Sequence, residues 1–307
     1  MKDFELGLAK QVLRLRLSQM IINERYKNGD FKIPIHLAFG HEAIAVAVDS
    51  IMEKNDKMIL HHRNIHYNLS RVRGLKATLE EYYLNKDGLA KGKQGSMNLC
   101  NPEKNIPYSS SILGNNLAVG SGVALGQKIN NINGVALIVV GDGGIEEGSF
   151  YESLLFQKSN RLSVLIIIEN NQWSLATRID ERRCEININK LADSLDVSYI
   201  KLEGNDLFHY IKKLKEMREF ALINETTVCI EVKLTTLGSW YMKTKEYPNG
   251  KFINYHAGPA PTVNVANGPV ITESKEDPVY VLKKYFDENT LKTYADELLT
   301  FLYEDIK

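Results

Sequence analysis

Residues 135–144, VALIVVGDGG, and residues 162–171, LSVLIIIENN, decide the fold of this chain. In each stretch a continuous run of apolar residues ends in residues that favour turns and polar contacts. Continuous apolar runs of this length are typical of strands that are buried on both faces, as in parallel sheets covered by helices. The sequence therefore predicts two buried parallel strands, at Val135–Val140 and Leu162–Ile168, within an α/β fold.

Helical patterns alternate with these strands, and the same pattern continues towards both ends of the chain. A capping box at Thr78–Glu81 is expected to open a helix that ends at Leu84. The other expected helices are Phe4–Lys27, Gly40–Lys54, Asn115–Ile129, Glu147–Asn160, Leu207–Ala221 and a segment after Asp277-Pro278. Thr227–Leu234 is expected to be a strand, and Asn85–Ser111 and Tyr241–Thr272 to be long loops. We find no internal repeat, so one α/β domain over residues 1–307 is expected.

Composition excludes several classes of protein. Of the 307 residues, 44% are hydrophobic and 25% charged, an ordinary globular mixture. Lys plus Arg and Asp plus Glu number 38 each, so no net charge favours nucleic acid or an anionic membrane. The three cysteines are far apart and predict reduced thiols. No apolar run is long enough to span a bilayer, and acids near the start argue against a signal peptide, so a cytoplasmic protein is expected.

Polar residues follow each central strand at the point where it ends. Asp142 comes after the first and Asn171 after the second, and one crossover would place both at the carboxyl edge of the sheet. Carboxylate and amide oxygens suit Mg²⁺, while Gly143 and Gly144 let the backbone approach an anion. The alternative is a turn at Asp142-Gly143 and a helix cap at Asn170-Asn171. Because the two features occur together, we favour a site for a metal ion and a diphosphate.

The motifs around these strands resemble one family. Gly141-Asp142-Gly143 followed at a distance by Asn170-Asn171 is similar to the motif that binds thiamine diphosphate and magnesium. The neighbouring sequence resembles the alpha subunit of the first component of 2-oxoacid dehydrogenases, of the pyruvate, branched-chain and acetoin types. The stretches that carry the resemblance, in chain order, are His36–Ala43 (HLAFGHEA, close to H-L-x-x-G-Q-E-A), Gly92–Met97, Ser111–Gly114, Glu147–Glu152, Asn170–Trp173, Gly204–Asp206 and Asp277-Pro278.

The resemblance implies a three-layer α/β/α thiamine-diphosphate-binding fold with a central, mainly parallel sheet. It also implies a role for each matching position. Magnesium would be bound by the side chains of Asp142 and Asn171 and by the backbone carbonyl of Trp173. The residues expected around the cofactor are His36, His62 and Arg63 at the diphosphate, Gly143 and Gly144 by their amides, and the backbone near Ser111 and Leu113 at the two rings. His36 and His62 are also catalytic candidates; alternatively His36 is a structural side chain, and His61 and His62 are surface residues.

In this family a glutamate that activates the cofactor's pyrimidine comes from a separate beta subunit. The chain that remains after Asn171 is too short for a second, pyrimidine-binding domain. The resemblance therefore implies half of an active site, which a beta subunit completes, in a heterotetramer of two alpha and two beta subunits.

The sequence departs from the family pattern at two places. The family's Y-R-x-H-G is replaced by His62-Arg63-Asn64-Ile65-His66, and its late H-G-H-S by Leu237-Gly238-Ser239-Trp240. The family's late histidines serve decarboxylation and acyl transfer to lipoamide, so their absence speaks against lipoyl-linked chemistry. The later His256 weakly resembles a substrate-facing histidine of transketolases. It is a candidate proton donor or acceptor, or a loop residue without a role.

Three functions follow from these observations. The first is decarboxylation of a 2-oxoacid and transfer of the activated aldehyde to an acceptor. The second is a transketolase-like or carboligase reaction that passes a two-carbon unit to an aldehyde or keto-sugar without lipoamide. The third is a non-catalytic subunit that stabilises a partner, against which the matched Asp142 and Asn171 argue. We interpret Gly120, Gly122 and Gly126 as close helix packing, and Glu146 and Glu147 as acids that complement a helix N-terminus.

Overall fold

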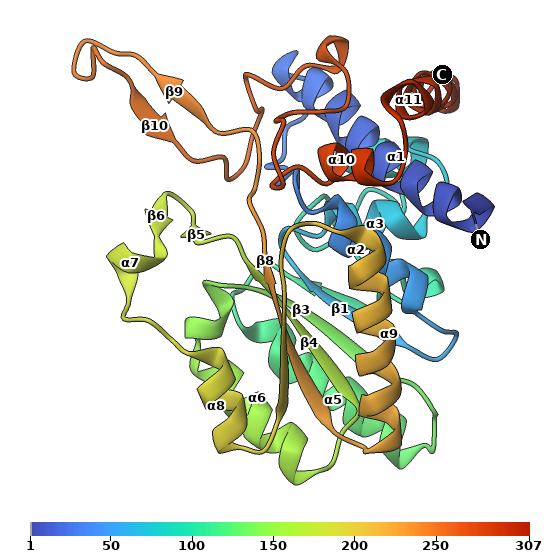
Figure 1. Ribbon diagram of the computed structural model, residues 1–307, viewed down its shortest axis with the longest axis vertical. Coiled ribbons are helices and arrows are strands. Elements are labelled where there is room, and N and C mark those ends of the chain that lie inside the picture. Colours follow the sequence, from blue (N-terminus) through green and yellow to red (C-terminus); the bar gives the residue numbers. More distant parts are fainter. Residues whose placement is uncertain (1) are drawn as a thin grey trace.

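A six-stranded sheet forms the centre of the molecule. The computed structural model describes residues 2–307. The strands all pair in parallel, in the order β2-β1-β3-β4-β8-β7 (Figure 1). Their bounds are β1 (Lys57–His61), β2 (Tyr108–Ser110), β3 (Ala136–Gly141), β4 (Val164–Asn170), β7 (Ser198–Leu202) and β8 (Thr227–Lys233). The two strands that the sequence placed at the centre, β3 and β4, are neighbours in the sheet.

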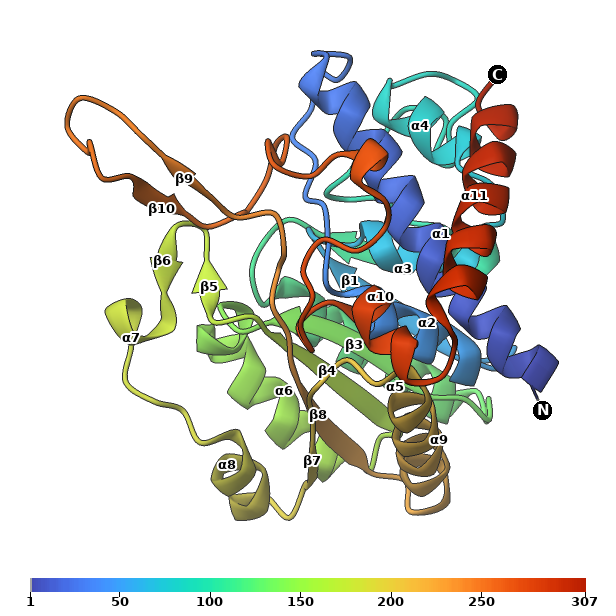
Figure 2. The same cartoon turned by 45° about the horizontal axis from the view of Figure 1, so that its top comes forward.

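Helices cover both faces of this sheet, as alternating side chains of the strands require. Ile138 and Ile166 point to one core, with α5 (Asn115–Ile129), α6 (Gly148–Ser159) and α8 (Ile188–Ser194), whereas Leu137 and Leu165 point to the other, with α2 (Glu42–Ile51) and α9 (Leu207–Ile223) (Figure 2). The expected three-layer α/β/α architecture is confirmed.

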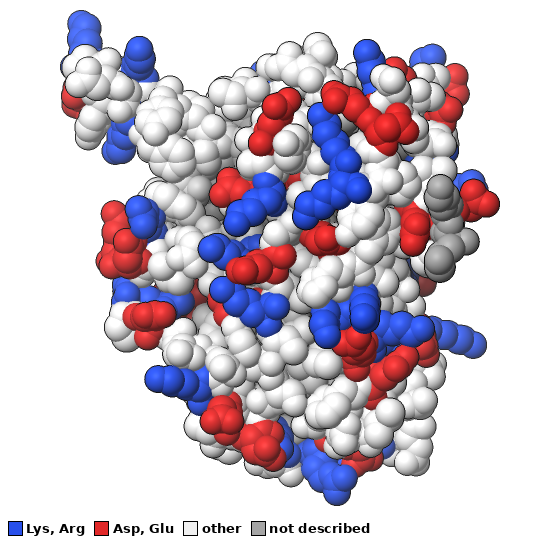
Figure 3. All heavy atoms as spheres, in the orientation of Figure 1, with Lys and Arg blue, Asp and Glu red and all other residues white. Residues whose placement is uncertain are grey.

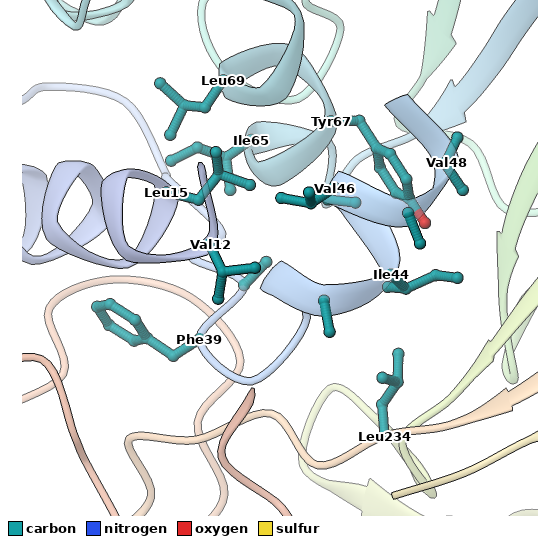
Figure 4. Packing of buried hydrophobic residues seen from close by; sticks show 14 of the residues in the cluster. Val12, Leu15, Phe39, Ile44, Val46, Val48, Ile65, Tyr67, Leu69 and Leu234 are labelled. Atoms are coloured by element: carbon teal, nitrogen blue, oxygen red, sulfur yellow. The ribbon is translucent and has the colours of Figure 1, made fainter. Parts of the chain in front are cut away.

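Further helices extend the second core beyond the sheet. In Figure 4, Val12 and Leu15 of α1 (Lys2–Lys27) lie against residues of α2 and of α3 (Ile65–Arg71). Near the end of the chain lie α10 (Pro278–Val281) and α11 (Glu288–Asp305). Buried Arg16 of α1 joins these parts, since its guanidinium pairs with Glu42 at 2.6 Å and with Asp277 at 3.0 Å. The two ends of the chain are therefore held to the same core.

The third expected helix begins elsewhere than its capping box predicted. α4 spans Lys76–Tyr82, so Thr78 lies inside the helix rather than at its start. Glu81 is not a capping side chain either. Its buried carboxylate accepts backbone N–H bonds of 2.8–3.0 Å from four residues of the following loop, namely Ala90, Gly92, Gln94 and Gly95. Glu81 therefore organises that loop, which the family-like Gly92–Met97 stretch belongs to.

Both long segments that were expected to be loops contain strands. The edge strand β2 and a single helical turn at Pro102–Lys104 lie within Asn85–Ser111. A hairpin of β9 (Trp240–Met242) and β10 (Lys251–Ile253) lies within the second segment and projects from the body (Figure 1). The smaller pair β5 (Trp173–Ser174) and β6 (Thr177–Arg178) precedes α7 (Ile179–Arg182).

The glycines of α5 have different environments. A Cβ at Gly120 would lie 2.5 Å from the side chain of Ile138, so the interpretation as close helix packing is confirmed there. A Cβ at Gly122 or Gly126 would meet no atom within 4 Å among residues 2–307, so that interpretation is wrong for these two. At the start of α5, Gly114 has φ +73° and packs against Glu147, a position at which a side chain would be strained and would clash.

Charged side chains of both signs are interspersed over the face seen in Figure 3. This distribution matches the equal numbers of acidic and basic residues. Across residues 2–307, no helix combines the length and the apolar character that a membrane crossing requires.

Candidate active site

A small cavity opens at the carboxyl edge of the sheet, where the ends of β1, β3 and β4 meet. Ligands of open α/β sheets bind at this edge, next to the point where the strand order reverses, here between β1 and β3. The cavity measures about 50 Å³ and is lined by His61, His62, Arg63, Leu113, Gly114, Asn116, Val140, Gly141, Asp142, Gly143, Gly144, Asn171, Trp173, Ser174 and His256. The structure thus brings together most of the residues that the sequence singled out.

Asp142 and Asn171 face this cavity from adjacent strand ends, as their positions predicted. The amide nitrogen of Asn171 donates to Thr236 Oγ1 at 3.1 Å, while its oxygen accepts the backbone N–H of Trp173 at 3.0 Å. These contacts fix the orientation of the Asn171 amide. Burial raises the pKa of Asp142, and the guanidinium of Arg182 acts in the opposite direction.

Arg182 is a residue of this site that the sequence did not indicate. Its guanidinium donates to Asp142 Oδ2 at 3.0 Å and to Glu146 Oε1 at 2.9 Å, and Arg183 also pairs with Glu146, at 2.8 Å. Glu146, expected to complement a helix N-terminus, lies just before α6, and its carboxylate also pairs with these two arginines. The β5–α7 segment (Trp173–Arg182) folds over the cavity, with Ser174 Oγ only 2.8 Å from where a Cβ of Gly143 would stand.

Three histidines surround the opposite wall beside Arg63. The ring centroid of His36 lies 4.9 Å from that of His62 and 4.9 Å from that of His256. The ring centroids of His62 and His256 are 5.9 Å apart. Buried Arg63 donates to the carbonyl of His256 at 2.9 Å. Burial, together with the charge of Arg63, lowers the pKa of His36 to about 2 and that of His256 to about 4. Burial likewise lowers the pKa of His62, with His61 and Arg63 contributing.

These histidines are therefore neutral at physiological pH, and each can donate one hydrogen bond and accept another. Their nitrogen atoms are close enough to hold a metal ion. However, Arg63 would repel a cation there, whereas an anion would be attracted. The arrangement fits a phosphate-bearing ligand better than a metal ion.

The departures from the family motif help to position His256. The backbone N–H of Tyr255 donates to Ser239 Oγ at 3.1 Å, and the N–H of Leu237 donates to the carbonyl of Phe39 at 2.8 Å. The altered Leu237–Trp240 stretch thus anchors the strand of chain that carries His256. As a result His256 lines the cavity, which the sequence alone left open.

A buried network lies behind the cavity around Glu169. Its carboxylate contacts His66 at 2.9 Å, Tyr67 at 3.0 Å and His41 at 3.3 Å. Burial acts against the charged carboxylate, yet His66 and His41 hold the pKa of Glu169 well below its usual range. His41 Nε2 also lies 2.9 Å from Thr236 Oγ1, the group that binds Asn171. The sequence carried one sign of this network, since His41 and His66 both stand at family motif positions that have other residues.

Two expected residues, Ser111 and His36, lie at the margin of the site. Leu113 lines the cavity, whereas Ser111 is exposed and its backbone N–H donates to Asn98 at 3.0 Å. His36 contacts the site through the rings of His62 and His256. Asn116 also lines the cavity, although the sequence analysis did not single it out. Its position in the first turn of α5 is the one sequence feature that could have indicated it.

The donor set fits a magnesium ion with a diphosphate. It offers a carboxylate and an amide oxygen on one side, cationic and neutral nitrogen donors on the other, and Gly143 and Gly144 between them. His36 Nδ1 is buried without a hydrogen-bond partner in the described part of the chain. Cofactor pockets usually measure about 300–1,000 Å³, so the cavity of about 50 Å³ is smaller than such pockets, with Trp173 and Ser174 of the β5–α7 segment in its wall.

Comparison with known families agrees with this geometry. Residues 10–236 match the model of a family described as "Dehydrogenase E1 component". The chain belongs to this family. Over 287 residues it is 26% identical to the pyruvate dehydrogenase E1 component subunit alpha of Rickettsia bellii. The matched region covers 94% of this chain and 83% of the relative. The mitochondrial subunit of that name from Dictyostelium discoideum is 26% identical over 231 residues, covering 75% of this chain and 60% of the relative.

Among solved structures, the chain resembles the transketolases of Campylobacter jejuni and Leishmania mexicana. The TM-scores are 0.60 and 0.61, at 14% sequence identity in each case and with 97% of this chain covered. The chain spans 48% and 45% of the lengths of these two transketolases. At such low identity this likeness shows the fold alone.

Family membership confirms the resemblance that the motifs indicated. The protein is an enzyme subunit of the thiamine-diphosphate-dependent 2-oxoacid dehydrogenase class, of the alpha type. The transketolase-like or carboligase alternative is not favoured, because the sequence relatives are E1 alpha subunits and the transketolases share the fold.

Proposed function

We propose that this chain, with a beta subunit, decarboxylates a small 2-oxoacid of the pyruvate type and passes the activated aldehyde to an acceptor. The observation that carries the proposal is the meeting of Asp142 and Asn171 with His62, Arg63 and His256 around one cavity. The names of the curated relatives, pyruvate dehydrogenase E1 alpha subunits, support a 2-oxoacid as the donor.

In this proposal Asp142 and Asn171 bind Mg²⁺ through their side-chain oxygens and Trp173 binds it through its backbone carbonyl. The contact of the Asn171 amide with Thr236 supports the assignment, because it turns the amide oxygen away from Thr236. Arg63 attracts the diphosphate, and the amides of Gly143 and Gly144 donate to it. The backbone near Ser111 and Leu113 holds the rings of the cofactor.

Thiamine diphosphate, when bound, supplies the carbon nucleophile and the electron sink for decarboxylation. The chain's own contribution is the placement of neutral imidazoles. His36, His62 and His256 hold or move a proton at the substrate side of the cavity, since a neutral ring nitrogen can accept a proton and its partner can donate one. His256 is the best placed, because it lines the cavity on an anchored segment.

A beta subunit is required, because the family alpha subunit carries half of the site. We propose that it contributes the glutamate that activates the pyrimidine, in a heterotetramer of two alpha and two beta subunits. The one six-stranded sheet supports residues 1–307 as a single domain. A cytoplasmic location remains part of the proposal.

The chain should be co-expressed with a beta-like partner and supplied with thiamine diphosphate, Mg²⁺ and pyruvate. One assay follows reduction of an artificial electron acceptor, and a second assay offers a panel of aldehydes and keto-sugars. Dye reduction is expected and would lead to a search for lipoamide as acceptor. A new carbon–carbon product without efficient lipoamide transfer would instead identify a carboligase. Silence in both assays, with cofactor bound, would exclude pyruvate as the donor.

The metal ligands can be tested independently of turnover. Asp142→Ala should abolish magnesium-dependent binding of thiamine diphosphate, because the one carboxylate in the proposed ligand set is lost. Trp173 lines the cavity, and the chain has just one other tryptophan, so quenching of tryptophan fluorescence in the complex can report binding. Asp180→Asn, an exposed position in α7, is the control. Unchanged affinity in Asp142→Ala would refute the ligand assignment.

A further inference from the structure

A second cavity lies between α1, the end of α3 and α11, and it shares no lining residue with the cavity at the sheet edge. Figure 2 shows α11 running beside α1. The cavity measures about 580 Å³ and is lined by Lys10, Gln11, Arg14, Ser70, Arg71, Val72, Arg73, Leu298 and Phe301. This volume falls in the usual range for small-molecule sites, about 300–1,000 Å³.

The walls of this cavity are strongly basic. Four lysine or arginine side chains line it and no acidic residue does. Arg71 is neutralised by Asp49 at 2.7 Å, and Lys10 lies 3.6 Å from Glu297 in an exposed pair, which contributes little. Arg14 and Arg73 form no ion pair with any of residues 2–307. A positive charge excess therefore remains at the cavity.

Arg14 is the buried cation of this wall, and it leaves part of its hydrogen-bonding capacity unused. Its side chain belongs to the buried set, with 9% of the residue exposed. Nη2 donates to the carbonyl of Leu69 at 2.9 Å, but Nη1 has no hydrogen-bond partner in the part of the chain that the structure describes. Burial lowers the pKa of Arg14, and the charge of Asp49 opposes that shift. A buried guanidinium with an unused donor is costly unless an anion binds it.

The remaining wall is apolar. Val72, Leu298 and Phe301 line the cavity beside the cations, and the Phe301 ring is partly exposed. Gln11 adds a buried side-chain oxygen that lacks a donor among the described residues. A ligand that complements this basic and apolar wall carries an anionic end and an apolar or flat body.

We propose that this cavity binds a small organic phosphate of about the size of a nucleoside diphosphate. The phosphate would lie against Arg14 and Arg73, because guanidinium groups form forked, charge-assisted hydrogen bonds with phosphate oxygens. The organic body would pack against Leu298 and Phe301. The site is separate from the proposed catalytic site, and it does not depend on the function assigned to that site.

Binding can be measured by titration calorimetry on the chain co-expressed with its beta-like partner. The probes are ADP, inorganic phosphate and adenosine, each added after thiamine diphosphate and Mg²⁺ have been supplied in an amount that fills the sheet-edge cavity without an excess that would compete for the second cavity. ADP should bind, inorganic phosphate should bind more weakly, and adenosine should not bind. No binding of ADP would overturn the proposal, whether the cavity is unsuited to phosphate or a partner segment covers it.

Variants then locate the bound ADP. Arg14→Gln and the exposed Arg73→Gln should each weaken ADP binding by about tenfold, since hydrogen bonds to charged groups contribute roughly that much. Lys215→Gln, an exposed cation on α9, is the control and should leave ADP binding unchanged. Should Arg14→Gln fail to fold, Arg73→Gln still decides the question. Equal ADP affinity in Arg73→Gln and in the unaltered complex would place ADP elsewhere and refute the site. Unchanged thiamine diphosphate affinity in Arg73→Gln keeps this test apart from that of the proposed function.

Discussion

At the scale of single residues, we propose that His256 compensates for histidines that the altered Leu237–Trp240 stretch lacks. Its ring stands beside His36 and His62, although it is far from both in the sequence. Position along the chain could suggest Asp142 and Asn171, because each follows an apolar run. It could not suggest Arg182, whose role depends on a contact across the fold with Asp142.

His256→Ala should lower kcat by about 10²-fold or more, the usual contribution of a general acid or base, while leaving the affinity for thiamine diphosphate unchanged. The reason is that His256 is proposed to face the substrate side of the cavity and is not one of the proposed magnesium ligands. Steady-state kinetics with pyruvate and a cofactor titration provide the two measurements. His209→Ala, an exposed histidine of α9, is the control. Normal turnover in His256→Ala would remove this residue from the mechanism.

The buried histidines predict a loss of stability in acid. Burial lowers the pKa of His66 to about 4, with Glu169 opposing the shift, and that of His36 to about 2. An unfolded histidine has a pKa near 6.5. The unfolded chain therefore binds more protons below that pH, and stability present at pH 7 is lost as the pH falls towards 4.

Each such histidine contributes a slope of up to about 1.4 kcal/mol per pH unit in this window. Urea unfolding at pH 7.5, 6.0 and 5.0 measures the effect. A free energy of unfolding that stays constant between pH 7 and pH 5 would contradict the neutral, buried state of these rings.

At the scale of elements, periodicity identified the central strands but missed those at the edges. β3 and β4 are long apolar runs, whereas β2 has three residues and β7 (SYIKL) contains polar side chains that the edge of the sheet leaves partly exposed. β1 has a buried apolar centre of just three residues, Met58–Leu60, which is too short a run to distinguish from a loop. Local sequence could predict these elements poorly because pairing with neighbouring strands decides them.

The β5–α7 segment predicts an effect on metal binding. The guanidinium of Arg182 occupies Asp142 Oδ2, so it competes with a cation for that oxygen. Arg182→Ala should therefore raise the affinity for Mg²⁺ in the presence of thiamine diphosphate, by up to about tenfold for the loss of one charge-assisted contact. Fluorescence titration with Mg²⁺ measures it.

Arg178→Ala, which removes an exposed pair with Asp180, is the matched control in the same segment. Weaker Mg²⁺ or cofactor binding in Arg182→Ala would show the reverse role, in which Arg182 binds the diphosphate instead of competing for Asp142.

At the scale of the whole molecule, exposed apolar side chains lie beside the candidate site. Ile112 is 67% exposed and is next to Leu113 in the cavity wall, and Tyr241, 70% exposed, packs on Phe252, whose ring lies 6.0 Å from that of Trp173 in the same wall. Exposed apolar groups grouped beside a functional cavity are typical of surfaces that a partner covers. The sequence could indicate the need for a beta subunit from family resemblance, but not the face on which it docks, since that depends on which apolar side chains the fold leaves uncovered.

Ile112→Asp should therefore weaken assembly with the beta subunit while leaving the alpha chain folded. A charge placed in an apolar interface must be desolvated on binding, and an unpaired buried charge is unfavourable. Sedimentation of the co-expressed complex measures assembly, and circular dichroism of the alpha chain measures its fold. The matched control is Ile223→Asp at the end of α9, whose apolar side chain is 81% exposed. Ile223 lies shortly before the start of β8, at the opposite edge of the sheet from the candidate site. If Ile112→Asp assembles as well as Ile223→Asp, the beta subunit does not cover the mouth of the cavity, and the glutamate that it is proposed to contribute could not reach the cofactor from that side.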